Sequence, residues 1–251
     1  MTPSTLVVVP TYNERATLAE VVERTLAAPV GAHVLVVDDN SPDGTGMLAD
    51  ELAARHPEVE VLHREEKRGL GPAYRAGLSW GLERGYDVLV EMDADLSHDP
   101  GQLPDLVSAL HHADLVIGSR YVPGGRIENW PWHRLLLSAG GNRYVQVVTG
   151  VPVRDATSGY RAYRRELLEE IDLLGIRSDG YSFQLEMVLR SWRLGFRVSE
   201  TPITFVERRE GASKISRAIV FEALWRVLVW GVSGPRRPAT THPRSVTASE
   251  R

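Results

Sequence analysis

Five short runs of apolar residues recur in the first half of the chain, and they limit the possible fold more than any other feature. Each run is continuous rather than alternating, which is typical of parallel strands buried on both faces of a sheet. The expected strands lie at residues 5–10, 33–39, 58–64, 86–93 and 113–120. Between them, apolar residues recur at helical spacing over residues 13–28, 43–56, 70–85 and 100–112. This alternation predicts an α/β fold with a mostly parallel, doubly wound sheet flanked by helices.

The pattern changes after the fifth run. Residues 121–134 contain turn-forming residues and two tryptophans, and we expect them to form a loop. Helices are expected at residues 134–149 and 180–195, and residues 197–209 are expected to add a strand. Residues 233–251 contain prolines and arginines with almost no apolar residues, a composition that predicts a disordered basic tail.

Length and composition are those of one globular domain, which we place at residues 1–232. The chain has 251 residues and a formal net charge of −4, which argues against a general nucleic-acid binder. It has no cysteine, so disulfides and thiolate metal sites are excluded, and a reducing compartment fits. The first ten residues lack a basic region before their apolar run, and we expect a first strand rather than a signal peptide.

The segment 213–232 is expected to form an amphipathic C-terminal helix. Its apolar stretch, residues 218–232, is shorter than a membrane-spanning helix and contains Glu222 and Arg226, which are spaced to pair on one helix face. One interpretation is a helix that lies on a membrane surface or docks on an integral membrane partner protein. The alternative is a helix packed against the domain core.

Polar side chains follow four of the expected strands at the points where the strands end. They are Tyr12 with Glu14, Asp38 with Asp39, Asp93 with Asp95, and Ser119 with Arg120. In an open parallel sheet, ligands bind in the crevice beyond the carboxyl ends of the strands. Together these residues predict an anionic crevice at one edge of the sheet.

Asp93 and Asp95 are the main candidates for metal ligands. Residues two apart in an extended segment point the same way, roughly 6–7 Å apart, so both carboxylates address one point. Two carboxylates with no His or Cys nearby suit Mg²⁺ or Mn²⁺ better than Zn²⁺. Because Mg²⁺ usually completes its shell with water and phosphate, the pair predicts a metal that bridges the chain to a diphosphate. The alternative is a solvated acidic loop.

Two further polar residues are expected to cap helices. Asp99 stands before Pro100 and a helical pattern, so it is expected to start that helix rather than to bind a metal. Ser41 stands before Pro42 and is expected to cap the next helix in the same way.

Motifs of several common enzyme classes are missing from the sequence. The first strand is followed by "PTYNE" rather than G-x-G-x-x-G, which argues against a dinucleotide-dependent dehydrogenase. The sequence also has no P-loop, no G-x-S-x-G and no H-E-x-x-H. These absences argue against P-loop nucleotidases, α/β-hydrolases and the common zinc proteases.

The segments "VVVPTYNE", "VVDDNSPDGT" and "MDADLSHDP", in this order and spacing, resemble family 2 glycosyltransferases of the GT-A fold. Four more segments, "IGSRYVPGG", "DATSGYRAYRR", "GYSFQLEM" and "FVERREGASKI", are similar to the polyprenol- and dolichol-phosphate mannosyltransferases. The resemblance covers about residues 4–232. It implies transfer of mannose from GDP-mannose to a polyprenyl phosphate with inversion, assisted by Mg²⁺ or Mn²⁺. It also implies attachment at the inner face of the cytoplasmic membrane.

Carried over by position, the resemblance assigns three groups of site residues. The donor nucleotide would contact Pro10, Tyr12, Glu14, Val37 and Asp39. The diphosphate and metal would lie along Asp93, Ala94 and Asp95, with Ser97 standing where some relatives have a stronger ligand, Gln. The acceptor phosphate would contact Arg120, Arg134 and Ser138. Arg208 and Lys214 would reach the donor phosphates, with Gln184 near the donor.

The implied chemistry needs cations more than it needs a base. An attacking phosphate oxygen is already anionic at neutral pH, so general-base help contributes little. A metal and basic residues bring two anions together and stabilise a departing diphosphate. Three alternatives stay open: UDP-glucose or another nucleotide sugar as donor, a catalytically silent nucleotide-sugar-binding subunit, and a solvated basic loop at Arg208 and Lys214.

Overall fold

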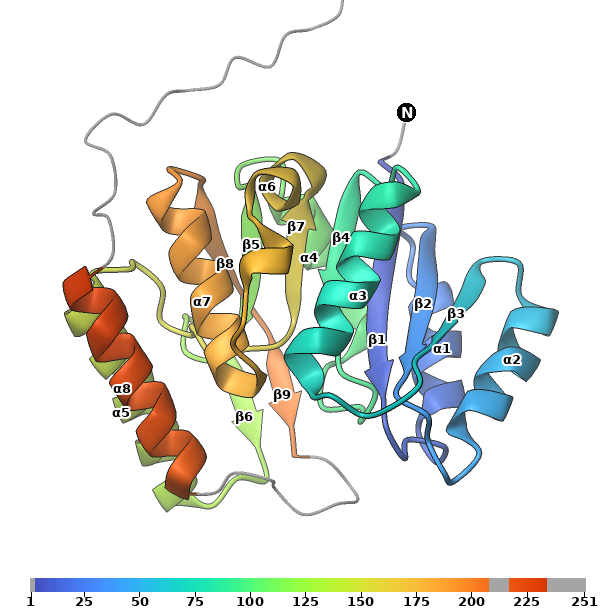
Figure 1. The fold of residues 1–251 in the computed structure, drawn as a ribbon, viewed down its shortest axis with the longest axis horizontal. Coiled ribbons are helices and arrows are strands. Elements are labelled where there is room, and N and C mark those ends of the chain that lie inside the picture. Colours follow the sequence, from blue (N-terminus) through green and yellow to red (C-terminus); the bar gives the residue numbers. More distant parts are fainter. Residues whose placement is uncertain (1–2, 208–216, 234–251) are drawn as a thin grey trace, which may run out of the picture.

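The chain folds around one mostly parallel sheet (Figure 1). The computed structural model describes residues 3–207 and 217–233, without the side chains of residues 217–223 and 233. Within these residues, seven strands pair in the order β3-β2-β1-β4-β7-β5-β8. They are β1 (Thr5–Thr11), β2 (Ala32–Asp38), β3 (Val59–His63), β4 (Val88–Glu91), β5 (Leu115–Ser119), β7 (Arg161–Arg164) and β8 (Val198–Pro202). The five strands expected from the first half of the chain are confirmed.

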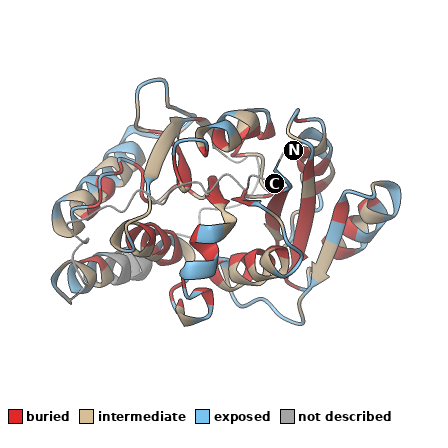
Figure 2. Cartoon of the chain, turned by 90° about the horizontal axis from the view of Figure 1, so that it is seen from above, coloured by how far each residue is buried: buried red, intermediate tan, exposed pale blue. Residues whose placement is uncertain are grey.

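Helices cover both faces of the sheet. One face carries α3 (Leu70–Glu83), α6 (Arg165–Glu170) and α7 (Gly180–Arg193), and the other carries α1 (Leu18–Leu26), α2 (Thr45–Arg55) and α4 (Leu103–Ala109). Successive residues of β1 point to opposite faces, so Leu6 and Val8 enter one core while Val7 and Val9 enter the other. Buried residues accordingly run along the central strands and the helix surfaces turned toward them (Figure 2).

Strand β7 was not predicted, and it is the antiparallel member of the sheet, between β4 and β5. Its sequence "RAYR" looks too polar for a central strand. Yet Arg161 is 0% exposed, because its guanidinium donates hydrogen bonds to the carbonyl oxygens of Ser158 (2.8 Å), Gln184 (2.8 Å) and Ala156 (2.7 Å). Backbone acceptors within the fold make a buried arginine tolerable, and the sequence pattern does not reveal them.

The segment expected as a loop, residues 121–134, contains strand β6 (Arg126–Glu128) and the first residues of α5 (Trp132–Thr149). The single strand expected at residues 197–209 is two strands, β8 and β9 (Thr204–Val206). Strand β9 leaves the main sheet and pairs with β6 in a separate two-stranded sheet. Short 3₁₀ helices lie at η1 (Pro100–Gln102) and η2 (Leu173–Gly175).

The expected C-terminal helix is present as α8 (Arg217–Ser233), which lies side by side with α5 at one end of the molecule (Figure 1). Val227 is buried in the core, whereas Trp225 and Val232 are exposed, so the helix packs against the domain on one side, and its contact with a membrane or partner stays a prediction. In the described part of the chain, no helix has the length and apolarity needed to cross a membrane. The side chain of Glu222 and the tail at residues 234–251 lie outside the described residues.

Helix α3 packs so closely on the sheet that it needs glycine at the contact. A Cβ added to Gly77 would lie 2.3 Å from Cγ1 of Val8, and one added to Gly81 would lie 2.6 Å from Cδ2 of Leu89. Both neighbours are fully buried. In a close-packed core, such an overlap forces the helix or the strand to shift.

We predict that Gly77→Ala destabilises the fold by about 1–2 kcal/mol in urea unfolding, because overpacking costs about 1–3 kcal/mol and outweighs the better helix propensity of Ala. Gly140→Ala on α5 is the matched control, since a Cβ there meets nothing within 4 Å. That variant should be as stable as the wild type or slightly more stable. Equal stability of the two variants would contradict the close packing of α3.

Candidate active site

The carboxyl ends of β1, β2, β4 and β5 lie at one edge of the sheet. Strand β1 pairs in parallel with β2 on one side and β4 on the other. Strand β5 has the same direction, because both β4 and β5 pair antiparallel with β7. Pro10 and Val37, expected to contact the same ligand, are direct partners in the β1–β2 register. The polar residues after these strands are therefore brought to a common edge, as the sequence predicts.

The segment after β3 covers the ends of β1 and β2. Nη1 of Arg64 lies 2.5 Å from Oδ1 of Asp39, and Nζ of Lys67 lies 3.7 Å from the ring centroid of Tyr12. Burial raises the pKa of Asp39 above its ordinary value, although the charge of Arg64 opposes this shift. Two of the residues expected at the nucleotide, Tyr12 and Asp39, thus lie beside cations that the chain itself supplies.

Ser41 does not cap the following helix, so that prediction is wrong. Its hydroxyl donates to Oδ1 of Asp38 (2.6 Å) and accepts from the backbone N–H of Asn13 (3.1 Å), which ties the two strand ends together. Helix α2 instead begins after Gly44, whose φ of 85° makes the turn. Glycine adopts this left-handed conformation without strain, so the helix starts later than a Ser-Pro pair suggests.

The acidic segment after β4 forms a tight turn. Oδ1 of Asp95 accepts a hydrogen bond from the backbone N–H of Ser97 (3.0 Å), and Leu96 between them has a φ of 62°. A left-handed leucine is a strained conformation, of the kind found where a site requires a particular geometry. Asp99 accepts from the N–H of Gly101 (2.8 Å) at the start of η1, which confirms its predicted capping role.

Asp93 is held by two residues that the sequence did not suggest. The hydroxyl of buried Tyr74, on α3, donates to Oδ1 of Asp93 (2.9 Å). Nδ1 of His98 accepts from the backbone N–H of Asp93 (3.3 Å) and lies 3.8 Å from its Oδ2. The expectation that no His lies near the acidic pair is therefore wrong. His98 is buried and stacks on Tyr160, and burial lowers its pKa below the ordinary value.

The oxygen donors of this turn fit a hard divalent cation. Asp93 and Asp95 supply carboxylates, and Oγ of Ser97 is buried with no hydrogen-bond partner among the described residues. In residues 3–207 and 217–233 there is no cluster of three or more His, Cys, Asp or Glu that could hold a metal. Two carboxylates and a hydroxyl suit Mg²⁺ or Mn²⁺ that takes its remaining ligands from water and phosphate.

Gln184 is buried and contacts the strand that carries the acidic turn. It is 2% exposed, and its Nε2 donates to Oε2 of Glu91 (2.8 Å), two residues before Asp93. Burial raises the pKa of Glu91 to about 7, although the charge of Arg161 and the hydrogen bond from Gln184 lower it. Gln184 therefore supports the strand that carries the acidic turn, and the donor-binding role expected for it stays a prediction.

Arg120 does not extend into the crevice as an open clamp. Its Nε and Nη2 donate to the two carboxylate oxygens of Asp155, each at 2.7 Å, and its backbone N–H donates to the same carboxylate at 3.0 Å. Both side chains are buried. Although "DATSGY" belongs to a segment that resembles the mannosyltransferases, nothing in it shows that Asp155 pairs with a residue 35 positions earlier.

Arg134 lies on the first turn of α5 and forms an ion pair with Glu207. Its guanidinium also lies 4.0 Å from the ring centroid of Trp130. Ser138 is one turn further along α5, so the two acceptor residues expected on this helix share one stretch of it. Arg208 and Lys214, the expected cations at the donor phosphates, lie outside the described residues.

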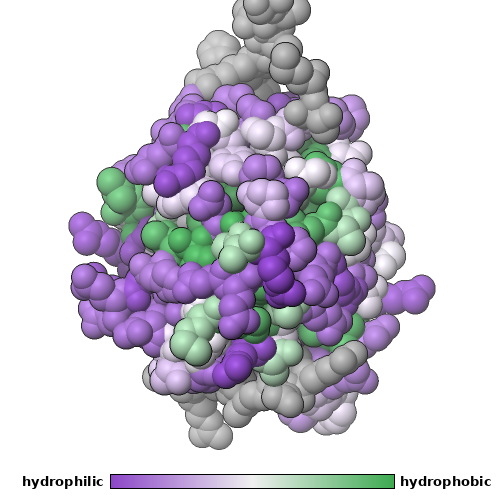
Figure 3. All heavy atoms as spheres, turned by 90° about the vertical axis from the view of Figure 1, so that its right-hand side faces the viewer, coloured by the Kyte–Doolittle hydropathy of each residue, from purple (hydrophilic) through white to green (hydrophobic). Residues whose placement is uncertain are grey.

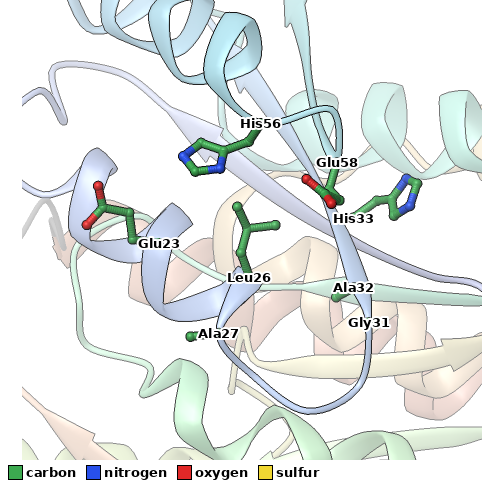
Figure 4. A pocket seen from close by; sticks show the side chains of 8 residues that line it. All are labelled: Glu23, Leu26, Ala27, Gly31, Ala32, His33, His56 and Glu58. Atoms are coloured by element: carbon green, nitrogen blue, oxygen red, sulfur yellow. The ribbon is translucent and has the colours of Figure 1, made fainter.

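A cavity of about 610 Å³ lies at the opposite end of β2, away from this edge (Figure 4). It is lined by Glu23, Leu26, Ala27, Gly31, Ala32, His33, His56 and Glu58. None of the predicted site residues lines it. The candidate active site is therefore the edge formed by the strand ends, not this cavity.

Comparison with known sequences gives a consistent family. The model of the family described as glycosyl transferase family 2 matches residues 6–172. A polyprenol monophosphomannose synthase of Mycolicibacterium smegmatis is 55% identical over 235 residues, which are 93% of this chain and 89% of that protein. An undecaprenyl-phosphate mannosyltransferase of Micrococcus luteus is 55% identical over 228 residues, or 91% of this chain and 94% of that one.

Solved structures share the architecture at low sequence identity. A glucosyl-3-phosphoglycerate synthase from Mycobacterium tuberculosis, in complex with Mn²⁺, UDP-glucose and phosphoglyceric acid, has a TM-score of 0.65 at 20% identity. The match covers 91% of this chain and 79% of that one. A mannosyltransferase from Pyrobaculum calidifontis, in complex with GDP-Man and Mn²⁺, has a TM-score of 0.59 at 21% identity and covers 92% and 63%. These likenesses show the fold.

We predict that Tyr74→Phe weakens Mn²⁺ binding about tenfold, because a hydrogen bond to a charged group contributes about 1.5–3 kcal/mol. The affinity is measured from the electron paramagnetic resonance signal of unbound Mn²⁺. Tyr86→Phe is the control, since the Tyr86 hydroxyl contacts Nδ1 of His33 (2.8 Å), far from the acidic turn. If Tyr74→Phe binds Mn²⁺ as tightly as the wild type, the hydrogen bond from Tyr74 to Asp93 does not contribute to metal binding.

Proposed function

The chain belongs to glycosyltransferase family 2 and has the GT-A fold, and from this premise we propose that it transfers mannose from GDP-mannose to a polyprenyl phosphate with inversion. Two relatives that are 55% identical over more than 90% of this chain, one a polyprenol monophosphomannose synthase, support the mannosyl donor and the lipid acceptor. The observation that carries the proposal is the turn Asp93–Ser97. It presents three oxygen donors at the edge where the strands end, as a nucleotide diphosphate requires.

On the donor side, the ends of β1 and β2 bind the nucleotide and the acidic turn binds its diphosphate. A divalent metal held by Asp93, Asp95 and Ser97 would neutralise the charge that develops on the departing diphosphate. Tyr74 fixes the Asp93 carboxylate, and the backbone N–H of Ser97 fixes that of Asp95. Carboxylates oriented before the ligand arrives do not need to reorganise during the reaction.

On the acceptor side, the phosphate itself is the nucleophile. One of its oxygens attacks the anomeric carbon of mannose while the bond from that carbon to the GDP oxygen breaks, and a single displacement inverts the configuration. Because this oxygen is already anionic, the site requires orientation and charge rather than a base. Arg120 directly follows β5 and Arg134 lies on the first turn of α5, and the guanidinium groups of both are suited to orient the phosphate.

A membrane-bound acceptor requires contact with a lipid surface, and α5 with α8 offers one. Exposed apolar side chains gather on these two helices, namely Trp132, Leu135, Leu136, Leu137 and Val147 on α5, and Leu224, Trp225, Leu228, Val229 and Val232 on α8. The opposite end of the molecule, formed by α2 and β3, is mainly hydrophilic with scattered apolar groups (Figure 3). We infer peripheral attachment through α5 and α8 at the cytoplasmic face of the membrane, on the bilayer or on an integral membrane partner.

The function is tested by incubating the protein with labelled GDP-mannose or UDP-glucose and a polyprenyl phosphate, with Mg²⁺, Mn²⁺ or a chelator. We predict label in the lipid from GDP-mannose, and its loss with the chelator. If label enters the lipid only from UDP-glucose, the donor is UDP-glucose and the proposal of mannose transfer is wrong. If the chelator does not change the rate of transfer, the proposed role of the metal is wrong.

We predict that Asp95→Ala lowers mannose transfer at least a hundredfold and leaves thermal unfolding unchanged, because the carboxylate acts on the ligand rather than on the core. Asp105→Ala is the control, an exposed aspartate in the first turn of α4. It should transfer mannose at the wild-type rate. Residual activity of Asp95→Ala within tenfold of wild type would contradict the assignment.

The membrane contact is tested with the double variant Leu136→Ser, Leu137→Ser. Burial of a leucine contributes about 1.5–3 kcal/mol, so we predict at least tenfold weaker binding to anionic phospholipid vesicles in flotation. Transfer to a water-soluble, short-chain acceptor should be retained. Met47→Ser, which changes an equally exposed residue on α2, is the control and should bind vesicles normally. Normal flotation of the double variant would move the membrane contact away from α5.

A further inference from the structure

The two arginines expected at the acceptor phosphate are each paired with a carboxylate. Arg120 is paired with Asp155, and Arg134 is paired with Glu207. Both guanidinium groups lie near the indole of Trp130, with the Cζ atoms 5.4 Å and 4.0 Å from the ring centroid. A phosphate that approaches these arginines therefore also approaches two carboxylates.

The charges of these four side chains sum to zero. A phosphate monoester carries about −1.5 to −2 charges near neutral pH, so its simple addition would leave these four side chains and the phosphate together with a net negative charge of that size. Repulsion between like charges near a protein surface is larger than in bulk water, because the effective dielectric constant is lower there. Tight binding of the phosphate to these arginines is therefore favoured if one carboxylate moves away.

Asp155 is not the carboxylate that moves. It is 0% exposed and accepts three hydrogen bonds from Arg120 alone. Burial by itself raises the pKa of Asp155, but the charge of Arg120 and the hydrogen bonds outweigh burial and keep this pKa below its ordinary value. Breaking such a buried pair costs about 3–5 kcal/mol, because each charge is then left without a partner.

Glu207 is the displaceable one. Its side chain is 27% exposed, and that of Arg134 is 21% exposed, so water reaches both partners. Ion pairs open to solvent contribute little stability and exchange partners at low cost. The backbone N–H of Glu207 donates to the carbonyl of Glu128 (3.2 Å), so the main chain stays anchored while the side chain moves.

Two donors at this place lack an acceptor. Nε of Arg134 and Nε1 of Trp130 are buried and make no hydrogen bond with any described residue. Buried N–H groups are nearly always satisfied, and phosphate oxygens are strong acceptors for both kinds of donor. The carboxylate of Glu207 therefore satisfies the guanidinium only in part, and a phosphate has more oxygens to offer.

We propose that Glu207 is an internal substitute for the acceptor phosphate, which displaces its carboxylate from Arg134 on binding. The identification of this ligand as a prenyl phosphate rests on the function proposed above. Exchange of one anion for another limits the negative charge around Arg134. Glu207 thus keeps Arg134 oriented before the acceptor binds. It also competes with other anions, so an anion with low affinity for Arg134 does not displace it.

The test is calorimetric titration of the full-length protein with geranyl phosphate, a water-soluble probe of this class. Glu207→Gln removes the competing charge, and we expect it to bind the probe at least fivefold more tightly than the wild type. Glu128→Gln is the matched control, an exposed residue on the paired strand with the same change in net charge, and should bind like the wild type. In the Arg134→Gln background, the gain from Glu207→Gln should disappear.

Three results would overturn the proposal: equal affinity in Glu207→Gln and Glu128→Gln, weaker binding in Glu207→Gln than in the wild type, or a gain that persists without Arg134. Glu207→Ala repeats the test should the Gln variant fold poorly. The titration involves no sugar, so its outcome is separate from that of the mannose-transfer assay. Tighter binding of geranyl phosphate by Glu207→Gln, without mannose transfer by the wild type, would support the role of Glu207 and refute the proposed function. Mannose transfer by the wild type, without tighter binding by Glu207→Gln, would support the proposed function and refute the role of Glu207.

Discussion

The parallel pairing of β1 with β2 and β4 is the interaction on which the rest of the structure depends. It places the carboxyl ends of three neighbouring strands side by side, so Tyr12, Asp39 and Asp93 come to the same edge of the sheet although up to 81 residues separate them in the chain. Helix α3 packs closely on this sheet, because Gly77 has no side chain that would overlap Val8 of β1. That close contact brings Tyr74 within 2.9 Å of Asp93, so the packing of one helix positions a carboxylate of the site.

Cations and anions around the crevice are paired within the chain before any ligand binds. Arg64 is paired with Asp39, Arg120 with Asp155 and Arg134 with Glu207. A chain with a net charge of −4 that handles phosphates must avoid both repelling its ligands and trapping unrelated anions. Pairing keeps cations available for the ligand while neutralising them toward unrelated anions. How deeply an ion pair is buried determines whether it can exchange its partner. Asp155 fixes Arg120 permanently, whereas Glu207 is accessible to water and exchangeable.

Much of the fold was predictable because its strands follow a simple rule. A strand buried on both faces is a continuous apolar run, and β1, β2, β4 and β5 all have this form. Strand β7 was missed because Arg161 breaks the rule, and its compensation comes from carbonyl groups that are distant in sequence. The capping role of Asp99 was predictable from its neighbours, whereas the same prediction for Ser41 was wrong, because a left-handed Gly44 sets the start of α2.

By itself, the sequence determined the strand–helix alternation, the edge at which the polar groups gather, and the acidic turn Asp93–Ser97. These features depend on local spacing, which the order of residues records directly. Only the tertiary structure decided which charges meet. The partners of Asp93, Arg120 and Arg134 are Tyr74, Asp155 and Glu207, at separations of 19, 35 and 73 residues. No periodic pattern encodes such pairs, because they depend on how helices and strands pack after the chain has folded.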